Sequence, residues 1–196
     1  MQKLVLATSN KGKLAELRPL LADAGYDLVT QGELGVADAV EDGRSFVENA
    51  IIKARHACVA TGLPALADDS GLVVRALGGA PGVLSARYAG AQGDSAANIA
   101  RLLGALEGVP EAEREAHFYC VLVLLRHADD PEPLIAEGRW HGRILAGRRG
   151  AGGFGYDPVF LDTASGLSAA ELEPATKNRV SHRGQAIARL RELLGA

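Results

Sequence analysis

The sequence alternates between short apolar runs of strand length and longer segments in which apolar residues recur every three or four positions. Runs of the first kind predict strands, and segments of the second kind predict helices with one buried face. The alternation continues along the chain without an internal repeat or a long linker. It therefore predicts an α/β protein whose strands include residues 3–8, 26–30, 117–125 and 134–144.

Helix boundaries are marked most clearly at Ser45. Glu48 follows three residues later as a capping-box partner, apolar residues then recur at helical spacing, and Gly62 is a typical helix end. Further helices are expected to begin near residues 10, 94 and 181. Because residues 134–144 follow a polar turn, they are expected to pair with the preceding strand as a hairpin, which makes the sheet mixed.

Composition limits the class of protein. The chain has 196 residues, 47% of them hydrophobic and 23% charged, so one compact domain spanning residues 1–196 is expected. A net charge of -3 and a pI near 6.0 argue against a nucleic-acid polymer as partner. Cys58 and Cys120 lack metal-binding spacing, so free buried thiols in a reducing compartment are expected. No signal peptide or long apolar run is apparent, so we expect a soluble cytoplasmic protein with no membrane partner.

The first candidate site follows the first predicted strand. Hydroxyl, amide and lysine side chains meet there at a helix start, whose positive end and free N–H groups favour an anion. The segment is not a Walker A loop, because Ala7 and Leu14 replace residues which that loop requires. A phosphate cradle and a capped turn with solvated lysines are both compatible with it. Its residues are Thr8, Ser9, Asn10, Lys11, Gly12 and Lys13.

A pair of adjacent carboxylates, Asp68 and Asp69, interrupts an apolar, strand-like run that covers residues 65–67 and 72–74. Two carboxylates in such surroundings repel each other and lose hydration, unless a cation or strong donors compensate. Oxygen ligands without a Cys or His cluster favour Mg²⁺, which takes one or two carboxylates plus substrate phosphates. A surface Asp-Asp-Ser-Gly turn is the alternative interpretation.

Two more residues could extend this site. Glu41 lies in an acidic stretch just before the Ser45 helix and is a candidate second metal ligand, although a solvated loop is equally compatible. Lys53 lies two turns into that helix and could reach a phosphate, although lysines at such positions often extend to solvent without a catalytic role. Glu48 is a poorer ligand candidate, because capping already gives it a local role.

Two further groups could bind a nucleobase. A Gly-rich run ends in an aromatic face with backbone donors and one carboxylate, which suits stacking on a planar base; its residues are Phe154, Gly155, Tyr156 and Asp157. A second group gathers hydrogen-bond donors near a helix start, where they favour a carbonyl oxygen; it comprises Lys177, Ser181, His182 and Arg183. Loop anchoring and ordinary helix capping are the respective alternatives.

Together, six motifs in this order resemble the inosine triphosphate pyrophosphatase family, in particular its bacterial dITP/XTP pyrophosphatase branch. The motifs are LATSNKGK at residues 6–13, SFVENAIIKA at 45–54, ADDSGL at 67–72, GGAPGVLSARYAG at 78–90, FGYDPVF at 154–160 and SHRGQA at 181–186. The resemblance implies an α/β fold with a mixed, bent central sheet flanked by helices, and two lobes with the active-site cleft between them. It also implies Mg²⁺ as cofactor and a homodimer.

The resemblance further implies roles for individual residues. Residues 8–13 would bind the triphosphate, Asp69 would be proton acceptor and Mg²⁺ ligand, and Ser70 would contact substrate. Glu41 matches the family's other acidic metal ligand, although the flanking VEDG differs from common family sequences. The base and sugar would be surrounded by Phe154, Gly155, Tyr156, Asp157, Lys177, His182 and Arg183.

The implied activity is hydrolysis of deaminated purine triphosphates (ITP, dITP and XTP) to the monophosphate and pyrophosphate. Water would attack the α-phosphorus, with Asp69 as base and with Lys13 and Lys53 neutralising charge on pyrophosphate. Two alternatives stay open. One is a pyrophosphatase for modified pyrimidine triphosphates, because a stacking loop and a phosphate cradle serve either base. The other is a nucleotide-binding sensor without hydrolytic activity.

Overall fold

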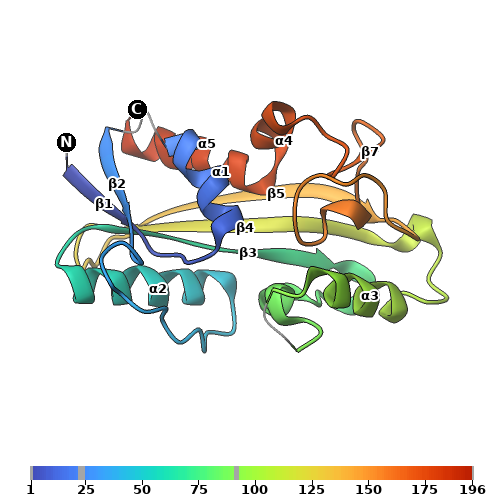
Figure 1. Ribbon diagram of the computed structural model, residues 1–196, viewed down its shortest axis with the longest axis horizontal. Helices are drawn as coiled ribbons and strands as arrows, with labels where there is room; N and C mark the ends of the chain where they lie inside the picture. Colours follow the sequence, from blue (N-terminus) through green and yellow to red (C-terminus); the bar gives the residue numbers. More distant parts are fainter. Residues whose placement is uncertain (1, 22–24, 91–92, 196) are drawn as a thin grey trace. The chain divides into compact units, whose positions relative to one another are not determined.

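The computed structural model describes residues 2–21, 25–90 and 93–195 (Figure 1). Within them the helices are α1 (Lys11–Leu21), α2 (Phe46–Thr61), α3 (Ser95–Ala105), α4 (Pro174–Val180) and α5 (His182–Leu194). The strands are β1 (Gln2–Leu6), β2 (Tyr26–Thr30), β3 (Ala65–Val74), β4 (Glu115–Leu125), β5 (Leu134–Ile144), β6 (Phe160–Asp162) and β7 (Leu167–Ser168). None of the helices in this part of the chain is both long and apolar enough to cross a membrane.

The described strands form one sheet in the order β2-β1-β3-β4-β5-β6-β7. β1 pairs in parallel with β2 and with β3, whereas β6 pairs antiparallel with β5 and β7. β4 and β5 are neighbours in the sheet and consecutive in the chain, as the predicted hairpin requires. The prediction of an α/β fold with a mixed sheet is therefore confirmed.

The chain divides into two compact units, which agrees with the two predicted lobes. The first unit comprises residues 1–69, 120–138 and 182–196. In it, α1 and α5 lie side by side on one face of the strands and α2 covers the other face (Figure 1). The face below α1 and α5 is apolar, because Leu4, Leu6, Leu66, Leu122 and Leu124 pack there against leucines of both helices.

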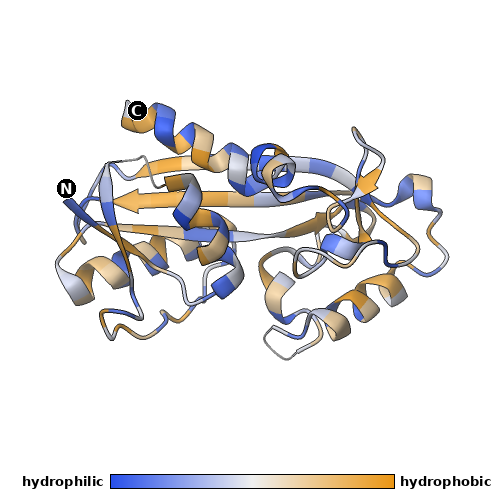
Figure 2. Ribbon diagram, turned by 45° about the horizontal axis from the view of Figure 1, so that its top comes forward, coloured by the Kyte–Doolittle hydropathy of each residue, from blue (hydrophilic) through white to orange (hydrophobic). Residues whose placement is uncertain are grey.

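The second unit comprises residues 70–119 and 139–181 and has a separate core. Phe118, Trp140 and Phe160 form its aromatic centre, with ring centroids 4.6 Å apart for Phe118 and Phe160 and 5.0 Å apart for Trp140 and Phe160. Ile99 and Leu102 of α3 pack into the same cluster. Figure 2 shows apolar residues along much of the strands, whereas the helices carry both apolar and polar residues.

Several local predictions are confirmed. Ser45 caps α2, since its side chain accepts from the backbone N–H of Glu48 while the Glu48 carboxylate accepts from the Ser45 N–H. Gly62 ends this helix in the left-handed conformation, with φ of 69°. Asp94 caps α3 by accepting from the Ala97 N–H. These helix boundaries were predictable from sequence because capping hydrogen bonds and a left-handed glycine depend on local residue types.

One prediction about the strands is wrong. The run around Asp68 and Asp69 was expected to be interrupted, but β3 is continuous from Ala65 to Val74. The polar residues remain in the strand because side chains from packed helices neutralise the carboxylates, as described below. α4, β6 and β7 were not predicted; each is short and lacks a periodic apolar pattern.

Candidate active site

Asp68 and Asp69 are both buried, with relative exposures of 1% and 7%. Because successive side chains of a strand point to opposite faces, these neighbours enter different surroundings. Their ion-pair partners agree with this: Asp68 contacts side chains of α1 and α5, whereas Asp69 contacts a side chain of α2. The two carboxylates therefore need separate physical accounts.

Asp68 lies in a network of buried ion pairs. One carboxylate oxygen pairs with the Lys13 ammonium, and the other accepts from Arg183 Nε at 3.1 Å and from the Cys120 thiol at 3.1 Å. Burial alone would raise the pKa of Asp68, but the charges of Lys13 and Arg183 hold it well below its ordinary value. Asp68 is therefore an ionised carboxylate fixed in place by two cations.

Asp69 has a different environment. Its Oδ1 pairs with Lys53 Nζ at 3.0 Å, and the same ammonium lies 3.5 Å from Glu41 Oε2. Burial raises the pKa of Asp69 above its ordinary value; Lys53 and Lys13 oppose this shift, and the charge of Glu41 adds to it. Its Oδ2 is buried and accepts no hydrogen bond from any described residue. Asp69 thus combines a raised proton affinity with an acceptor oxygen available to a ligand.

Lys53 is held between these two carboxylates. Burial would lower the pKa of this ammonium, but Asp69 and Glu41 outweigh that effect and raise it. The lysine is therefore a fixed positive charge beside Asp69, and not a side chain that extends to solvent. Glu41 was predicted only as a candidate for this neighbourhood, and the structure brings it there through Lys53.

The predicted phosphate segment connects β1 to α1. Asn10 caps α1, since its Oδ1 accepts from the Lys13 N–H at 3.1 Å, and Thr8 Oγ1 accepts from the Asn10 N–H at 3.2 Å. Ser9 Oγ donates to Asp38 at 2.6 Å. Lys11, Gly12 and Lys13 form the first turn, which carries no acidic residue. A helix start without acids and with exposed polar groups is suited to an anion.

The predicted base-binding loop lies in the second unit. Asp157 organises it by accepting from the Phe154 N–H at 2.8 Å and from Lys177 Nζ at 2.7 Å. Lys177 Nζ also lies 5.1 Å from the centroid of the Phe154 ring, whose residue is 42% exposed. Tyr156 is buried and donates to the Ser85 carbonyl. The loop therefore presents the exposed Phe154 ring and is held in place by hydrogen bonds to Asp157.

Gly153 and Gly155 give this loop its shape. Both have left-handed backbone conformations, with φ of 71° and 59°. A Cβ added at Gly153 would lie 2.1 Å from Asp157 Oδ2, so a side chain there would displace the organising carboxylate. Ser70, the remaining predicted substrate contact, lies in β3 directly after Asp69 and is partly buried.

His182 and Arg183 begin α5 and are both buried. The Arg183 guanidinium pairs with Asp68 and also with Glu16 of α1. Gly138 of β5 allows α5 to approach, because a Cβ there would lie 2.0 Å from the His182 carbonyl oxygen and 2.7 Å from the Ala186 nitrogen. Arg183 thus links α5 to α1 and β3, and its predicted contact with a base stays a prediction.

Comparisons with known proteins decide the family. The Ham1 family model matches residues 4–193. A dITP/XTP pyrophosphatase from Xanthomonas campestris is 61% identical over 196 residues, covering 100% of this chain and 98% of the relative. One from Xylella fastidiosa is 58% identical, covering 99% and 98%. The structure of a HAM1 protein from Coxiella burnetii matches with a TM-score of 0.93 at 50% identity, covering 100% and 99%.

The chain belongs to the Ham1 family. This confirms the resemblance inferred from the six sequence motifs, and it places Asp69, Lys53 and Glu41 in a family whose compared relatives bear a pyrophosphatase name.

The donor set of this Ham1-family protein fits Mg²⁺. Asp69 supplies a buried oxygen that accepts no hydrogen bond from the described residues, and Glu41 shares Lys53 with it. No group of three or more His, Cys, Asp or Glu residues within ranges 2–21, 25–90 and 93–195 is arranged to hold a metal. Mg²⁺ is commonly held by one or two carboxylates and completed by water and substrate phosphates, so Asp69 and Glu41 would suffice as its protein ligands.

Sequence reasoning missed three contributors to this site. Glu16, Cys120 and Gly138 were not proposed, although each contacts or positions Arg183 or Asp68. In the sequence, Glu16 lies at a position typical of a solvent-facing helix residue, and Cys120 lies in an apolar run typical of a core strand. A glycine within a strand indicates only a close backbone approach. Their roles become visible only when α1 and α5 are seen packed on the strands β3, β4 and β5.

Proposed function

We propose that this Ham1-family protein is a nucleoside triphosphate pyrophosphatase that hydrolyses ITP, dITP and XTP to the monophosphate and pyrophosphate. Such an activity removes deaminated purine nucleotides before they enter DNA and RNA. The observation that carries the proposal is Asp69: a buried carboxylate with a raised pKa, an acceptor oxygen available to a ligand, and a fixed ammonium at 3.0 Å. The high identity to named dITP/XTP pyrophosphatases supports the substrate class.

The phosphates would be bound by residues of the β1–α1 connection and by two lysines. Thr8, Ser9, Asn10 and the first turn of α1 bind the phosphates through hydroxyl, amide and backbone donors. Lys53 is fixed beside Asp69, and its positive charge would neutralise negative charge that develops on the leaving pyrophosphate. Lys13 pairs with Asp68 in the structure, so its contact with a phosphate requires it to exchange or share that partner.

Asp69 would act as the base. It accepts a proton from water while the water oxygen forms a bond to the α-phosphorus, and the bond from that phosphorus to the bridging oxygen breaks to release pyrophosphate. Its raised pKa favours this role, because a base with an ordinary aspartate pKa is a weaker proton acceptor at neutral pH. Asp69 and Glu41 would hold Mg²⁺, which when bound neutralises polyphosphate charge.

The proposal also assigns residues of the second unit and of α5 to the binding of the nucleobase. Phe154 offers an exposed ring on which the base would stack. Hydrogen-bond donors such as His182 would favour a purine with a 6-oxo group, because the amino group of adenine would leave these buried donors without an acceptor. Residues Gly155, Tyr156, Asp157 and Lys177 would shape this subsite. A homodimer and a cytoplasmic location belong to this proposal as well.

The test combines substrates with two variants. Purified protein is given ITP, XTP, GTP, ATP and a modified pyrimidine triphosphate, with and without Mg²⁺, while nucleotide monophosphate and pyrophosphate are both measured. We expect pyrophosphate from ITP and XTP only with Mg²⁺. Asp69→Asn should bind ITP without turnover, and Asp129→Asn, which alters an exposed carboxylate of the same unit, should behave as wild type.

The rival functions give other patterns. Preferred turnover of the pyrimidine nucleotide would favour the alternative pyrophosphatase, and tight ITP binding by wild type without product would favour a sensor. Normal turnover by Asp69→Asn would remove Asp69 from the mechanism and with it the central argument.

A further inference from the structure

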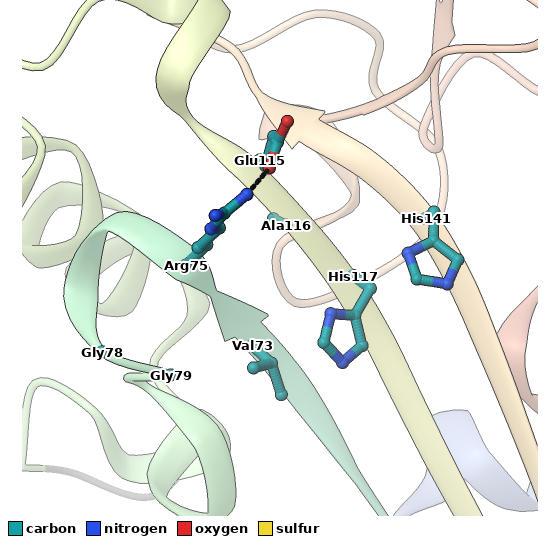
Figure 3. A pocket seen from close by; sticks show the side chains of 8 residues that line it. All are labelled: Val73, Arg75, Gly78, Gly79, Glu115, Ala116, His117 and His141. Carbon is teal, nitrogen blue, oxygen red and sulfur yellow. Dashed lines mark hydrogen bonds and ion pairs between the residues drawn. The ribbon is translucent and has the colours of Figure 1, made fainter.

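The outward face of the sheet in the second unit carries a feature that the proposed hydrolysis does not use. Alternate residues of β4 and β5 enter the core, which leaves His117 half-buried and His141 exposed on the opposite face. Both rings line a pocket of about 420 Å³ (Figure 3). The other lining residues are Val73, Arg75, Gly78, Gly79, Glu115 and Ala116.

The two imidazole rings are close enough to share one ion. Their centroids are 5.4 Å apart and their planes are inclined by 37°. A metal bound about 2.0 to 2.1 Å from one nitrogen of each ring would lie roughly 3.2 Å from each centroid. Once each ring is turned so that one nitrogen points at the ion, the centroid separation of 5.4 Å corresponds to an angle of about 115° at the metal, close to the tetrahedral angle that Zn²⁺ prefers.

The electrostatic setting favours a neutral His117 imidazole, the form that binds metals. Burial, the neighbouring His141 and the charge of Arg139 lower the pKa of His117 below its ordinary value of 6.5. Arg75 also lines the pocket, and its charge is compensated by Glu115 at 2.9 Å. Arg139 lies over the Tyr119 ring, with its guanidinium carbon 4.7 Å from the centroid.

We propose that His117 and His141 form a two-histidine site for a divalent transition-metal ion such as Zn²⁺, in the second unit and separate in residues from the Asp69 site. The described residues offer no third His, Cys, Asp or Glu placed for the same ion, so water completes the coordination inside the pocket. Imidazole ligands select Zn²⁺, Ni²⁺ or Cu²⁺ over Mg²⁺, which prefers oxygen. The site joins neighbouring strands β4 and β5, so an ion bound there stabilises the folded protein.

The experiment measures Zn²⁺ binding by calorimetry in excess Mg²⁺, which occupies oxygen-ligand sites. Wild type is compared with His141→Ala, His117→Ala and the control His127→Ala, which removes an exposed histidine of the other unit. We expect the affinity for Zn²⁺ to fall at least tenfold in each of the first two variants and to stay unchanged in the control. Asp69→Asn should also keep the site, which separates it from the proposed hydrolytic centre.

Histidine ring NMR signals and thermal unfolding give a second readout. Zn²⁺ should shift the ring resonances of His117 and His141 before those of other histidines, and it should raise Tm in wild type but not in His141→Ala. Circular dichroism spectra establish that each variant is folded. Absence of Zn²⁺ binding to wild type, or affinities within threefold of wild type in both pocket variants, overturns the proposal.

Discussion

Replacing Asp68 with alanine tests whether the buried ion pairs hold the first unit together. Lys13 loses its carboxylate partner in this variant, whereas Arg183 retains its pair with Glu16. Both cations have little access to water, with side-chain exposures of 14% for Lys13 and 2% for Arg183. The variant therefore leaves positive charge in a region of low hydration and should be destabilised.

The magnitude follows from these contacts. Removing one partner of a buried ion pair costs about 3 to 5 kcal/mol. Because Arg183 keeps Glu16 and Lys13 is near the surface, we expect the lower value, about 3 kcal/mol of unfolding free energy. With a slope of roughly 2 to 3 kcal/mol per molar urea, the unfolding midpoint should fall by about 1 to 1.5 M.

Urea unfolding followed by far-ultraviolet circular dichroism measures this loss, with Asp129→Ala as the exposed-carboxylate control. Trp140, the chain's single tryptophan, reports on the second unit by fluorescence and shows whether both units lose stability together. A loss below about 0.5 kcal/mol at pH 7, the range of ordinary surface substitutions, would refute the buried-network account.

The pH dependence gives an internal check on the same variant. Burial opposes ionisation of Asp68, but Lys13 and Arg183 prevail and hold its folded-state pKa well below the ordinary value of 3.8. The ionised carboxylate therefore contributes stability that is present above the unfolded pKa and is lost as the pH falls through the folded pKa. The difference between wild type and Asp68→Ala should shrink in strong acid.

Three other predictions follow from local geometry. Gly138→Ala should lower stability by about 1 to 3 kcal/mol, measured by urea unfolding, because its Cβ would lie 2.0 Å from the His182 carbonyl oxygen; unchanged stability would contradict this approach. Ser45→Ala should cost about 1 kcal/mol through loss of the α2 cap without changing turnover. In the metal-free protein the Asp69 carboxyl should titrate above the ordinary aspartate pKa of 3.8, because burial raises its pKa; carboxyl NMR signals assigned with Asp69→Asn measure this, and a titration at or below that value would contradict the account of its environment.

The parts of the fold that were predictable from sequence are those with local signals. The α2 capping box and the strand at residues 134–144 agree with the structure at their boundaries, because capping residues and period-two alternation mark them directly. α4 and β6 carry no such signal and depend on packing against the second core. When intrinsic propensity does not distinguish helix from strand in a short segment, tertiary contacts determine which structure forms.

The site was predictable in residue type but not in pairing. Asp69, Lys53 and Glu41 were all candidates, and the structure brings these three together. Lys13 and Arg183 were predicted to face a nucleotide, yet here they meet Asp68. Sequence cannot reveal that pairing, because Lys13, Arg183 and Asp68 come from three different elements. Only the packing of α1 and α5 on β3 brings them into contact.

Strand geometry explains how one dipeptide supports two tasks. If Asp68 and Asp69 lay in a surface turn, the alternative interpretation of the sequence, both would share solvent and have similar proton affinities. In a continuous strand they face different helices, so one receives two compensating cations while the other receives one cation together with a nearby acid. Their pKa values consequently shift in opposite directions. Environments that separate two carboxylates in this way commonly distinguish a fixed charge from a proton-transfer group. Asp68→Ala and Asp69→Asn should therefore separate the two tasks, because the first removes the carboxylate that two cations compensate and the second removes the proposed proton acceptor.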